Sequence, residues 1–159
     1  NLFFLAKKFP RRKIIAIEPF KNGLANIVYF CEKYKIKNIY LFPFVFQKFI
    51  TKYKNYFFDQ CYIFFPDPWP KKKHKKRRLI SYTFLKELIS HCSSKGSIHF
   101  SSDSIDYFKS VQNYAKILKK RGIRISIKLH KKTPTTITKY HNRALKLGTY
   151  VNFLKIEKI

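Results

Sequence analysis

The sequence predicts an α/β fold: a Rossmann-like, doubly wound, mostly parallel sheet with antiparallel strands at its C-terminal end. Short apolar runs alternate with segments that carry apolar residues at helical spacing. The early runs are apolar throughout, as is typical of strands buried on both faces of a parallel sheet. A later run, residues 123–129, alternates apolar and polar side chains, which indicates a strand with one solvated face.

The first half of the chain predicts three helices and three strands. A helix over Leu2–Lys8 stops before Pro10, and the strand Ile14–Ile17 ends at Glu18. A helix over residues 22–34 would bury one apolar face, formed by Leu24, Ile27, Val28 and Cys31. The remaining elements are a strand at 38–42, a weaker helix at 44–53 and a strand at 61–65.

The second half continues the alternation. Helical spacing predicts a helix whose apolar face is Phe84, Leu85, Leu88, Ile89 and Cys92, and a longer one whose face is Ile105, Phe108, Val111, Ala115 and Leu118. A strand at 97–101 separates them, and Gly122 is placed to end the second helix at the C′ position. A basic, Thr-rich loop then leads to a last strand at about 150–156.

Length and charge indicate one domain with a polyanionic partner. The chain has 159 residues, is 45% hydrophobic and carries a net charge of +27. One domain over residues 1–159 can therefore bury a core, and such a charge attracts nucleic acid above all. Abundant Ile, Asn, Phe and Tyr accompany the scattered lysines, as expected of an AT-rich genome, so local charge density is more informative than the total.

The cysteines, the histidines and the hydropathy of the chain give no indication of disulfides, a metal site or a membrane span. The three cysteines lie in apolar contexts without metal or disulfide spacing, which favours buried thiols in a reducing, cytoplasmic setting. The five histidines are dispersed, so no metal site is predicted. No apolar run is long enough to span a membrane. The chain contains no Met, and we expect it to be incomplete at its N-terminus.

The most informative segment is a proline-rich loop followed by a basic run. Pro66, Asp67, Pro68, Trp69 and Pro70 follow an expected strand, and the loop leads into residues 71–78, seven of which are cationic. Proline restricts the backbone, so this loop would hold its acid with little freedom. Asp67 could still be an ordinary turn aspartate, and Trp69 either a core anchor or a platform for a base. The basic run could be a solvated surface, a nuclear-localisation-like signal or a phosphate contact.

Three acids follow expected strand ends. These are Glu18, Asp67 and Asp103, and ligands of doubly wound sheets bind beyond the carboxyl ends of the strands. We therefore expect the three carboxylates along one edge. Glu18 could accept from the hydroxyls of a cofactor ribose or be an exposed loop carboxylate. Asp103 could belong to a site or could be the N-cap of the helix after it.

Several ordered segments resemble the bacterial tRNA (guanine-N7)-methyltransferase family. The resemblance extends over nearly the whole chain. It rests on Phe64-Phe65-Pro66-Asp67-Pro68-Trp69-Pro70-Lys71 with the basic run after it, Ala16-Ile17-Glu18, Ser101-Ser102-Asp103, and Thr138-Lys139-Tyr140-His141 with Arg143 and Gly148.

The resemblance implies a Rossmann-type enzyme that transfers a methyl group from S-adenosylmethionine to N7 of a variable-loop guanine in tRNA. It implies that Glu18 holds the cofactor ribose, that Val45 stands at the adenine position, and that Asp67 lies at the methyl-transfer site beside the cofactor. The residues implied to contact the guanosine are Lys71, Asp103, Thr138, Lys139, Tyr140 and His141. Those implied to grip tRNA phosphates are Lys73, His74, Lys75, Lys76, Arg77 and Arg78.

The chain also departs from the family pattern. The resemblance places a first strand and a glycine-rich, cofactor-binding loop before Asn1. Val45 and His141 occupy positions where the family has acids, Ser104 replaces a tryptophan and Ala144 a glycine. Two other functions stay open: a non-catalytic RNA-binding remnant, and an amino-methyltransferase, although those enzymes use a second adjacent proline that Asp67-Pro68-Trp69 lacks.

Overall fold

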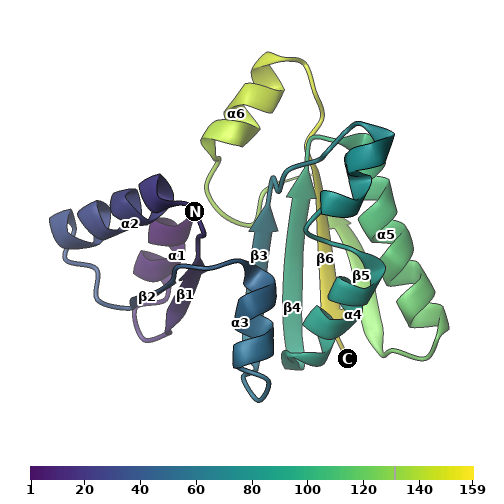
Figure 1. The fold of residues 1–159 in the computed structure, drawn as a ribbon, viewed down its shortest axis with the longest axis horizontal. Helices are drawn as coiled ribbons and strands as arrows, with labels where there is room; N and C mark the ends of the chain where they lie inside the picture. Colours follow the sequence, from purple (N-terminus) through teal and green to yellow (C-terminus); the bar gives the residue numbers. More distant parts are fainter. Residues whose placement is uncertain (131) are drawn as a thin grey trace. The chain divides into compact units, whose positions relative to one another are not determined.

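The computed structural model describes residues 1–130 and 132–159, which form two compact units (Figure 1). The first unit comprises Asn1–Lys54 with Pro134–Thr136, and the second comprises Asn55–Thr133 with Ile137–Ile159. Each unit contains a sheet, and both sheets contain parallel strands. Within the described ranges, no helix is both long and apolar enough to cross a bilayer.

The first unit is an alternating α/β segment. Its elements are α1 (Leu2–Lys8), β1 (Ile14–Ile17), α2 (Lys21–Lys33), β2 (Ile39–Phe42) and α3 (Phe46–Lys52). The two strands pair in parallel, with Ile14 opposite Ile39. Phe42 is buried and its ring packs edge-on against Phe49 at 5.2 Å, which fixes α3 to the end of β2. This parallel pairing is what brings the residues after β1 and after β2 to the same edge.

The apolar face expected on α2 is only half-buried: Leu24, Ile27 and Cys31 are partly covered and Val28 is exposed. No residue of α2 is fully buried among the described residues, and Val28 is 44% exposed. The reason is physical: the sheet of this unit has two strands, and so narrow a sheet covers little of a thirteen-residue helix. The helix itself extends over nearly the expected residues.

The second unit is a four-stranded mixed sheet with the order β3-β4-β6-β5. Strands β3 (Phe58–Phe64) and β4 (Cys92–Ser102) are parallel, while β6 (Asn152–Lys158) is antiparallel to both β4 and β5 (Ile125–His130). The other elements are a 3-10 helix η1 (Lys72–Arg77), α4 (Tyr82–Ser90), α5 (Ile105–Lys120) and α6 (Lys139–Lys146). The expected fold class, with antiparallel strands at the C-terminal end, is confirmed.

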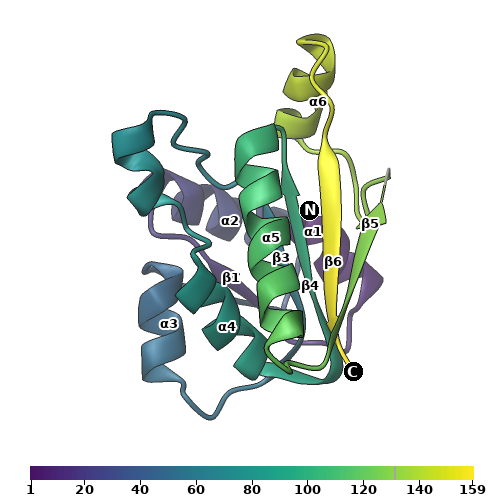
Figure 2. The same ribbon diagram turned by 90° about the vertical axis from the view of Figure 1, so that its right-hand side faces the viewer.

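Helices α4 and α5 lie against one face of this sheet (Figures 1 and 2). That face carries the apolar side chains of β4 and β6, such as Ile98 opposite Ile156 and Phe100 opposite Leu154, all about 1% exposed. Burying such side chains stabilises the fold by roughly 1.5–3 kcal/mol each. The core therefore holds rigid the strands β3 and β4, whose carboxyl ends carry the candidate site.

The structure differs from the prediction at three places. Cys92 begins β4 instead of ending the preceding helix, because α4 stops at Ser90 and Cys92 pairs with Phe58. The basic run forms η1, and the Thr-rich loop contains α6, whose polar sequence hides its helical character. Gly122 has φ +88°, which confirms it as the residue that ends α5.

The cysteines occupy packed positions. Cys92 is 1% exposed, and Cys31 and Cys61 are half-buried. Burial raises the pKa of Cys61 to about 12 and that of Cys92 to about 11, so both are protonated thiols at neutral pH. These two residues match the expected structural role.

Candidate active site

The proline loop leaves β3 under backbone strain. The Phe65 N–H donates to the Ser101 carbonyl at 3.0 Å, so the pairing with β4 continues one residue beyond the strand. Phe65 and Trp69 have φ values of +52° and +41°. Non-glycine residues in this region are destabilising by about 1–3 kcal/mol each, so surrounding contacts must hold the loop in place.

Trp69 provides one of those contacts. Its half-buried ring lies edge-on to His74 at 5.7 Å, and the Arg77 guanidinium carbon lies 5.0 Å from its centre. Such cation–π contacts contribute roughly 0.5–2 kcal/mol. Trp69 therefore joins the loop to the basic helix η1. Its half-buried ring is intermediate between the two positions expected for it, a core anchor and an exposed platform for a base.

Arg78 provides the second contact. Its side chain is 7% exposed, and its guanidinium lies 4.8 Å from the centre of the Tyr107 ring. Its Nε donates to the Pro68 carbonyl at 2.8 Å, and its Nη2 donates to Asp106 Oδ2 at 2.5 Å. We expected Arg78 to contact RNA with the rest of the basic run. The structure instead turns it inward, where it joins the loop to the start of α5.

Asp106 receives two cations. Lys75 Nζ donates to its Oδ1 at 3.0 Å, and Arg78 donates to its Oδ2. These hydrogen bonds, that of Lys75 first, hold the pKa of the Asp106 carboxyl below its usual value. Both η1 and the proline loop are thus joined to the first turn of α5 through one carboxylate.

Asp67 is left free by this arrangement. Its side chain is exposed, and no described residue bonds to its carboxylate. Asp103 is also exposed, and it is not the N-cap of α5: Ser104 is, because its hydroxyl accepts from the Tyr107 N–H at 3.4 Å. Phe64 and Ser101 are paired in adjacent parallel strands, so the two acids follow neighbouring carboxyl ends. The second unit therefore presents two of the three expected strand-end acids at one edge, both unengaged.

The block from Thr138 to His141 forms the start of α6. The Thr138 hydroxyl accepts from the His141 N–H at 3.0 Å and so caps the helix. The half-exposed Tyr140 ring stacks on Phe65 at 6.2 Å with an interplanar angle of 26°, and His141 lies 6.3 Å from the same ring. Lys139 Nζ lies 5.2 Å from the Tyr140 ring. This block is thus packed beside the first residue of the proline loop.

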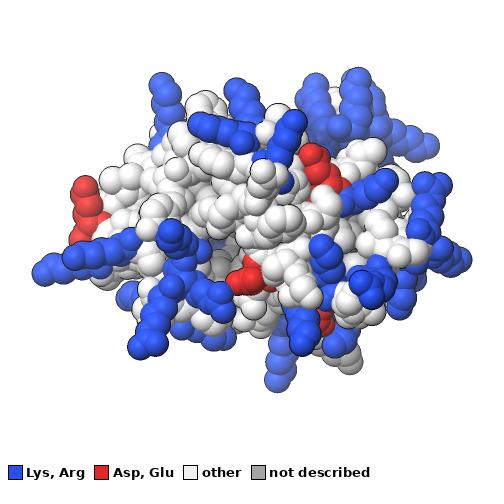
Figure 3. Space-filling model, turned by 90° about the horizontal axis from the view of Figure 1, so that it is seen from below, with Lys and Arg blue, Asp and Glu red and all other residues white. Residues whose placement is uncertain are grey.

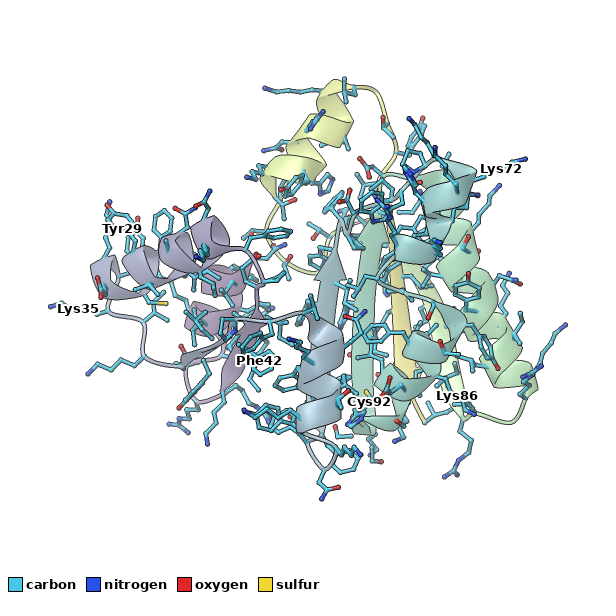
Figure 4. The ribbon with its side chains drawn as sticks, viewed as in Figure 1. Tyr29, Lys35, Phe42, Lys72, Lys86 and Cys92 are labelled. Atoms are coloured by element: carbon cyan, nitrogen blue, oxygen red, sulfur yellow. The ribbon has the colours of Figure 1, made fainter. Side chains whose placement is uncertain are left out.

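The rest of the basic run faces solvent. The exposed members are Lys71, Lys72, Lys73, Lys76 and Arg77, while His74 and Lys75 are half-buried. Lys72 projects from the outer side of η1 (Figure 4). Lys and Arg side chains also project around the edges of the face drawn in Figure 3, with few acids among them. The basic helix is therefore a projecting surface suited to phosphates.

Glu18 lies in the first unit, directly after β1. Its N–H donates to the Phe42 carbonyl at 3.2 Å, which places it beside the end of β2. One carboxylate oxygen accepts from the Phe20 N–H at 3.0 Å. No other donor among the described residues engages the carboxylate, so its second oxygen is open to a ligand hydroxyl.

The first unit fits the adenosine part of S-adenosylmethionine. The Glu18 carboxylate suits ribose hydroxyls, and exposed apolar side chains lie after both strands: Phe20 (74%), Phe44 (47%) and Val45 (45%). Val45 is the N-cap of α3 and can contact a purine only through its apolar surface. Among the described residues, no group of three or more His, Cys, Asp or Glu is arranged to hold a metal ion.

Two residues important for these sites, Gly23 and Asp106, were not found from the sequence, and Phe65 was named only as part of the proline-loop motif. A Cβ on Gly23 would lie 2.6 Å from the Glu18 carboxyl carbon, so a larger residue there would displace the Glu18 carboxylate from this position. A glycine in the first turn of a helix, five residues after a strand-end acid, is a signal that could have indicated it. Asp106 and Phe65 carry no such signal, because their roles depend on contacts distant in sequence.

Comparison with known proteins decides the family. A family model described as "Putative methyltransferase" matches residues 1–154. A tRNA (guanine-N(7)-)-methyltransferase of Wolbachia pipientis wMel is 31% identical over 159 residues, which are all of this chain and 70% of that protein. The chain belongs to this methyltransferase family. The resemblance to the tRNA (guanine-N7)-methyltransferases, which are S-adenosylmethionine-dependent enzymes, is thereby confirmed.

Two other relatives are proteins of which this chain covers a smaller share. It is 27% identical to a tRNA (guanine-N(7)-)-methyltransferase of Buchnera aphidicola, with 93% of this chain covering 63% of that protein. It is 31% identical to a bifunctional methyltransferase of Rickettsia felis, with 97% of this chain covering 29% of that protein. The chain thus spans about two thirds of the first of these relatives and under a third of the second.

Solved structures agree on the fold. An rRNA methylase from Streptococcus thermophilus superposes with a TM-score of 0.61 at 12% identity, with coverage of 92% of this methyltransferase and 74% of that chain. A protein from Streptococcus mutans described as a putative methyltransferase in complex with SAH gives a TM-score of 0.58 at 14% identity, with coverage of 92% and 76%. At these identities the likeness supports the Rossmann-like fold.

Proposed function

We propose that this methyltransferase transfers the methyl group of S-adenosylmethionine to N7 of a variable-loop guanine in tRNA. The observation that carries the proposal is the unengaged Asp67 in a loop held on both sides by cations, next to the free Asp103. The names of the relatives from Wolbachia and Buchnera support this choice of substrate.

The chemistry needs positioning more than proton transfer. Guanine N7 has a lone pair at neutral pH, and bound S-adenosylmethionine supplies an electrophilic methyl group. Asp67 would orient the purine or the sulfonium, and its charge, with that of Asp103, would stabilise the positive charge that moves onto the base. The fixed loop is suited to this role, because a preformed carboxylate needs no reorganisation as charge moves.

Each unit would supply its own groups for binding. Glu18 would accept from the ribose hydroxyls of the cofactor, and Phe44 with Val45 would contact its adenine. Lys71, Lys139, Tyr140 and His141 would line the guanosine side, and Thr138 would act by capping α6, since its hydroxyl is already engaged. The exposed part of the basic helix η1 would bind RNA phosphates.

Product analysis tests the proposal. The chain is incubated with methyl-labelled S-adenosylmethionine and unmodified tRNA, and the nucleosides are analysed by mass and by cleavage specific for N7-methylguanosine. We expect label in a guanosine with cleavage at that position. Methylation without cleavage would indicate an amino-methyltransferase. Binding of tRNA without transfer of label would indicate an RNA-binding remnant.

A further inference from the structure

A second basic surface lies in the first unit, at the opposite end of β1 from Glu18. A hollow of about 600 Å³ opens there between the α1–β1 loop and the α2–β2 turn. Six of its lining side chains are cationic and none is acidic: Lys7, Arg11, Arg12, Lys13, Lys35 and Lys37. The family resemblance gives no role to any of these residues.

The backbone around this hollow is fixed by Asn38. Its amide Nδ2 lies 3.1 Å from each of three carbonyl oxygens, those of Ala6, Phe9 and Arg12. The α1–β1 loop is thereby tied to the residue that precedes β2. Side chains on this loop and on the α2–β2 turn are therefore held around one space instead of being scattered along mobile segments.

The opposite wall is the end of α2. Lys35 has φ +51°, its N–H donates to the Glu32 carbonyl, and the Ile36 N–H donates to the Cys31 carbonyl at 2.9 Å. This Schellman arrangement usually has glycine where Lys35 stands. A lysine in that conformation is strained, yet here it is one of the lining residues and adds a cation to the hollow.

Two tyrosines lie among the cations. Tyr34 is 49% exposed and Tyr40 is 51% exposed. Lys7 Nζ lies 4.9 Å from the Tyr34 ring centre, and Lys13 Nζ lies 6.0 Å from the Tyr40 ring centre. Exposed aromatic rings beside cations are the combination that binds single-stranded nucleic acid, by stacking on bases and by contact with phosphates.

We propose that this hollow is a second RNA-binding site, which takes backbone phosphates and an unpaired base of the RNA substrate. Several like charges around one space repel each other, and a ligand with several negative charges removes that repulsion. A polynucleotide supplies such charges at regular spacing, and the tyrosines supply a surface for its base. That the RNA is tRNA rests on the proposed function; the site itself does not.

The hollow is separate from the residues proposed to hold the cofactor. Lys13 precedes β1 and Glu18 follows it, and five residues of extended chain span about 16 Å. Loss of the cations should therefore weaken RNA binding and raise KM, while kcat at saturating RNA stays within about twofold of the original.

The test compares two variants with equal loss of charge. In the first, R11Q/R12Q/K35Q/K37Q, the cations of the hollow are removed. In the second, K86Q/K116Q/K119Q/K120Q, cations of α4 and α5 are removed. Binding of unmodified tRNA is measured from low to moderate salt. We expect the first variant to bind at least tenfold more weakly, and the slope of log binding constant against log salt concentration to be smaller by about 2–3. The affinity of the second variant should change less than threefold.

Further measurements keep the result decisive. R11K/R12K retains the charge and should bind like the original chain, and circular dichroism checks that each variant is folded. Bound tRNA should also slow hydrogen exchange at residues 11–13 in the original chain. The proposal is overturned if the two quadruple variants weaken tRNA binding equally, or if tRNA does not protect residues 11–13. It is also overturned if the chain binds anionic lipid vesicles and tRNA does not displace them. If no methyl transfer is found but the binding difference persists, only the proposed function fails.

Discussion

Arg78 donates to Asp106 at 2.5 Å, and through this pair the proline loop is fixed to the first turn of α5. The same guanidinium donates to the Pro68 carbonyl, next to Asp67, at 2.8 Å. The planar guanidinium donates to the two acceptors from separate nitrogens, whereas the ammonium of lysine has all its donors on one nitrogen and does not match this spacing. The basic run thus has two roles: Arg78, its last residue, fixes the loop, and its exposed cations stay accessible to a partner.

The Arg78→Lys change should loosen the loop. We expect a loss of about 1–3 kcal/mol in the free energy of unfolding, because charge-assisted hydrogen bonds are lost in a half-buried place. Methyl transfer should fall about tenfold. The chain has one tryptophan, Trp69, so iodide quenching of its fluorescence reports the loop directly and should increase. Arg121→Lys, which changes an arginine bonded to Tyr82, is the matched control; equal quenching in both variants would contradict this account.

The Asp67→Asn change should reduce turnover without loss of stability. The carboxylate is exposed and bonded to no described residue, so the folded state has no interaction there to lose. We expect kcat to fall at least tenfold, because the developing positive charge loses its partner. The thermal midpoint should move by less than about 2 °C, as for surface changes within ±0.5 kcal/mol. Near-normal turnover of Asp67→Asn would exclude this role.

Neutralising the exposed part of the basic helix should flatten the salt dependence of tRNA binding. The variant is K72Q/K73Q/K76Q, which spares Lys75 and Arg78 because they bond to Asp106, and Arg77 because it contacts Trp69. The loss of three phosphate contacts should lower the slope of log binding constant against log salt concentration by about 2–3. K86Q/K116Q/K120Q carries the same charge change on α4 and α5. An unaltered slope in the first variant would mean that other cations bind the RNA.

His99 should make the protein sensitive to acid. Burial first, and then Lys155 and His130, lower the pKa of its imidazole from 6.5 to about 4, while its ring stacks on Tyr62 at 4.7 Å. A lowered pKa means that the neutral form is favoured in the folded state. The resulting stability is present above pH 6.5 and is lost as the pH falls through about 4.

The His99→Gln variant tests this pH dependence. After allowance for the partial exposure of His99, we expect the original chain to lose about 1–2 kcal/mol from this group between pH 7 and pH 4. Urea unfolding at both pH values measures the loss. The variant should show a smaller decrease between the two values, and an equal decrease would assign the acid sensitivity to other groups.

The sequence was sufficient for elements whose signal is local. The strand Ile14–Ile17 and the C′ glycine at Gly122 follow from apolar runs and from turn chemistry alone. Helix α6 was missed because most of its residues are polar and Ala144 alone is buried. The free state of Asp103 was also undecided, because Ser104 next to it is an equally good cap.

The sequence by itself determined the family, the order of the strands and of all helices but η1 and α6, and the acids that follow strand ends, because these depend on residue type and spacing. The tertiary structure alone decided which charges are free. It turned Arg78 inward to Asp106, left Asp67 and Asp103 unengaged, and gathered six cations around one hollow. Such outcomes depend on hydrogen bonds and packing between segments distant in the chain, and no local pattern records them.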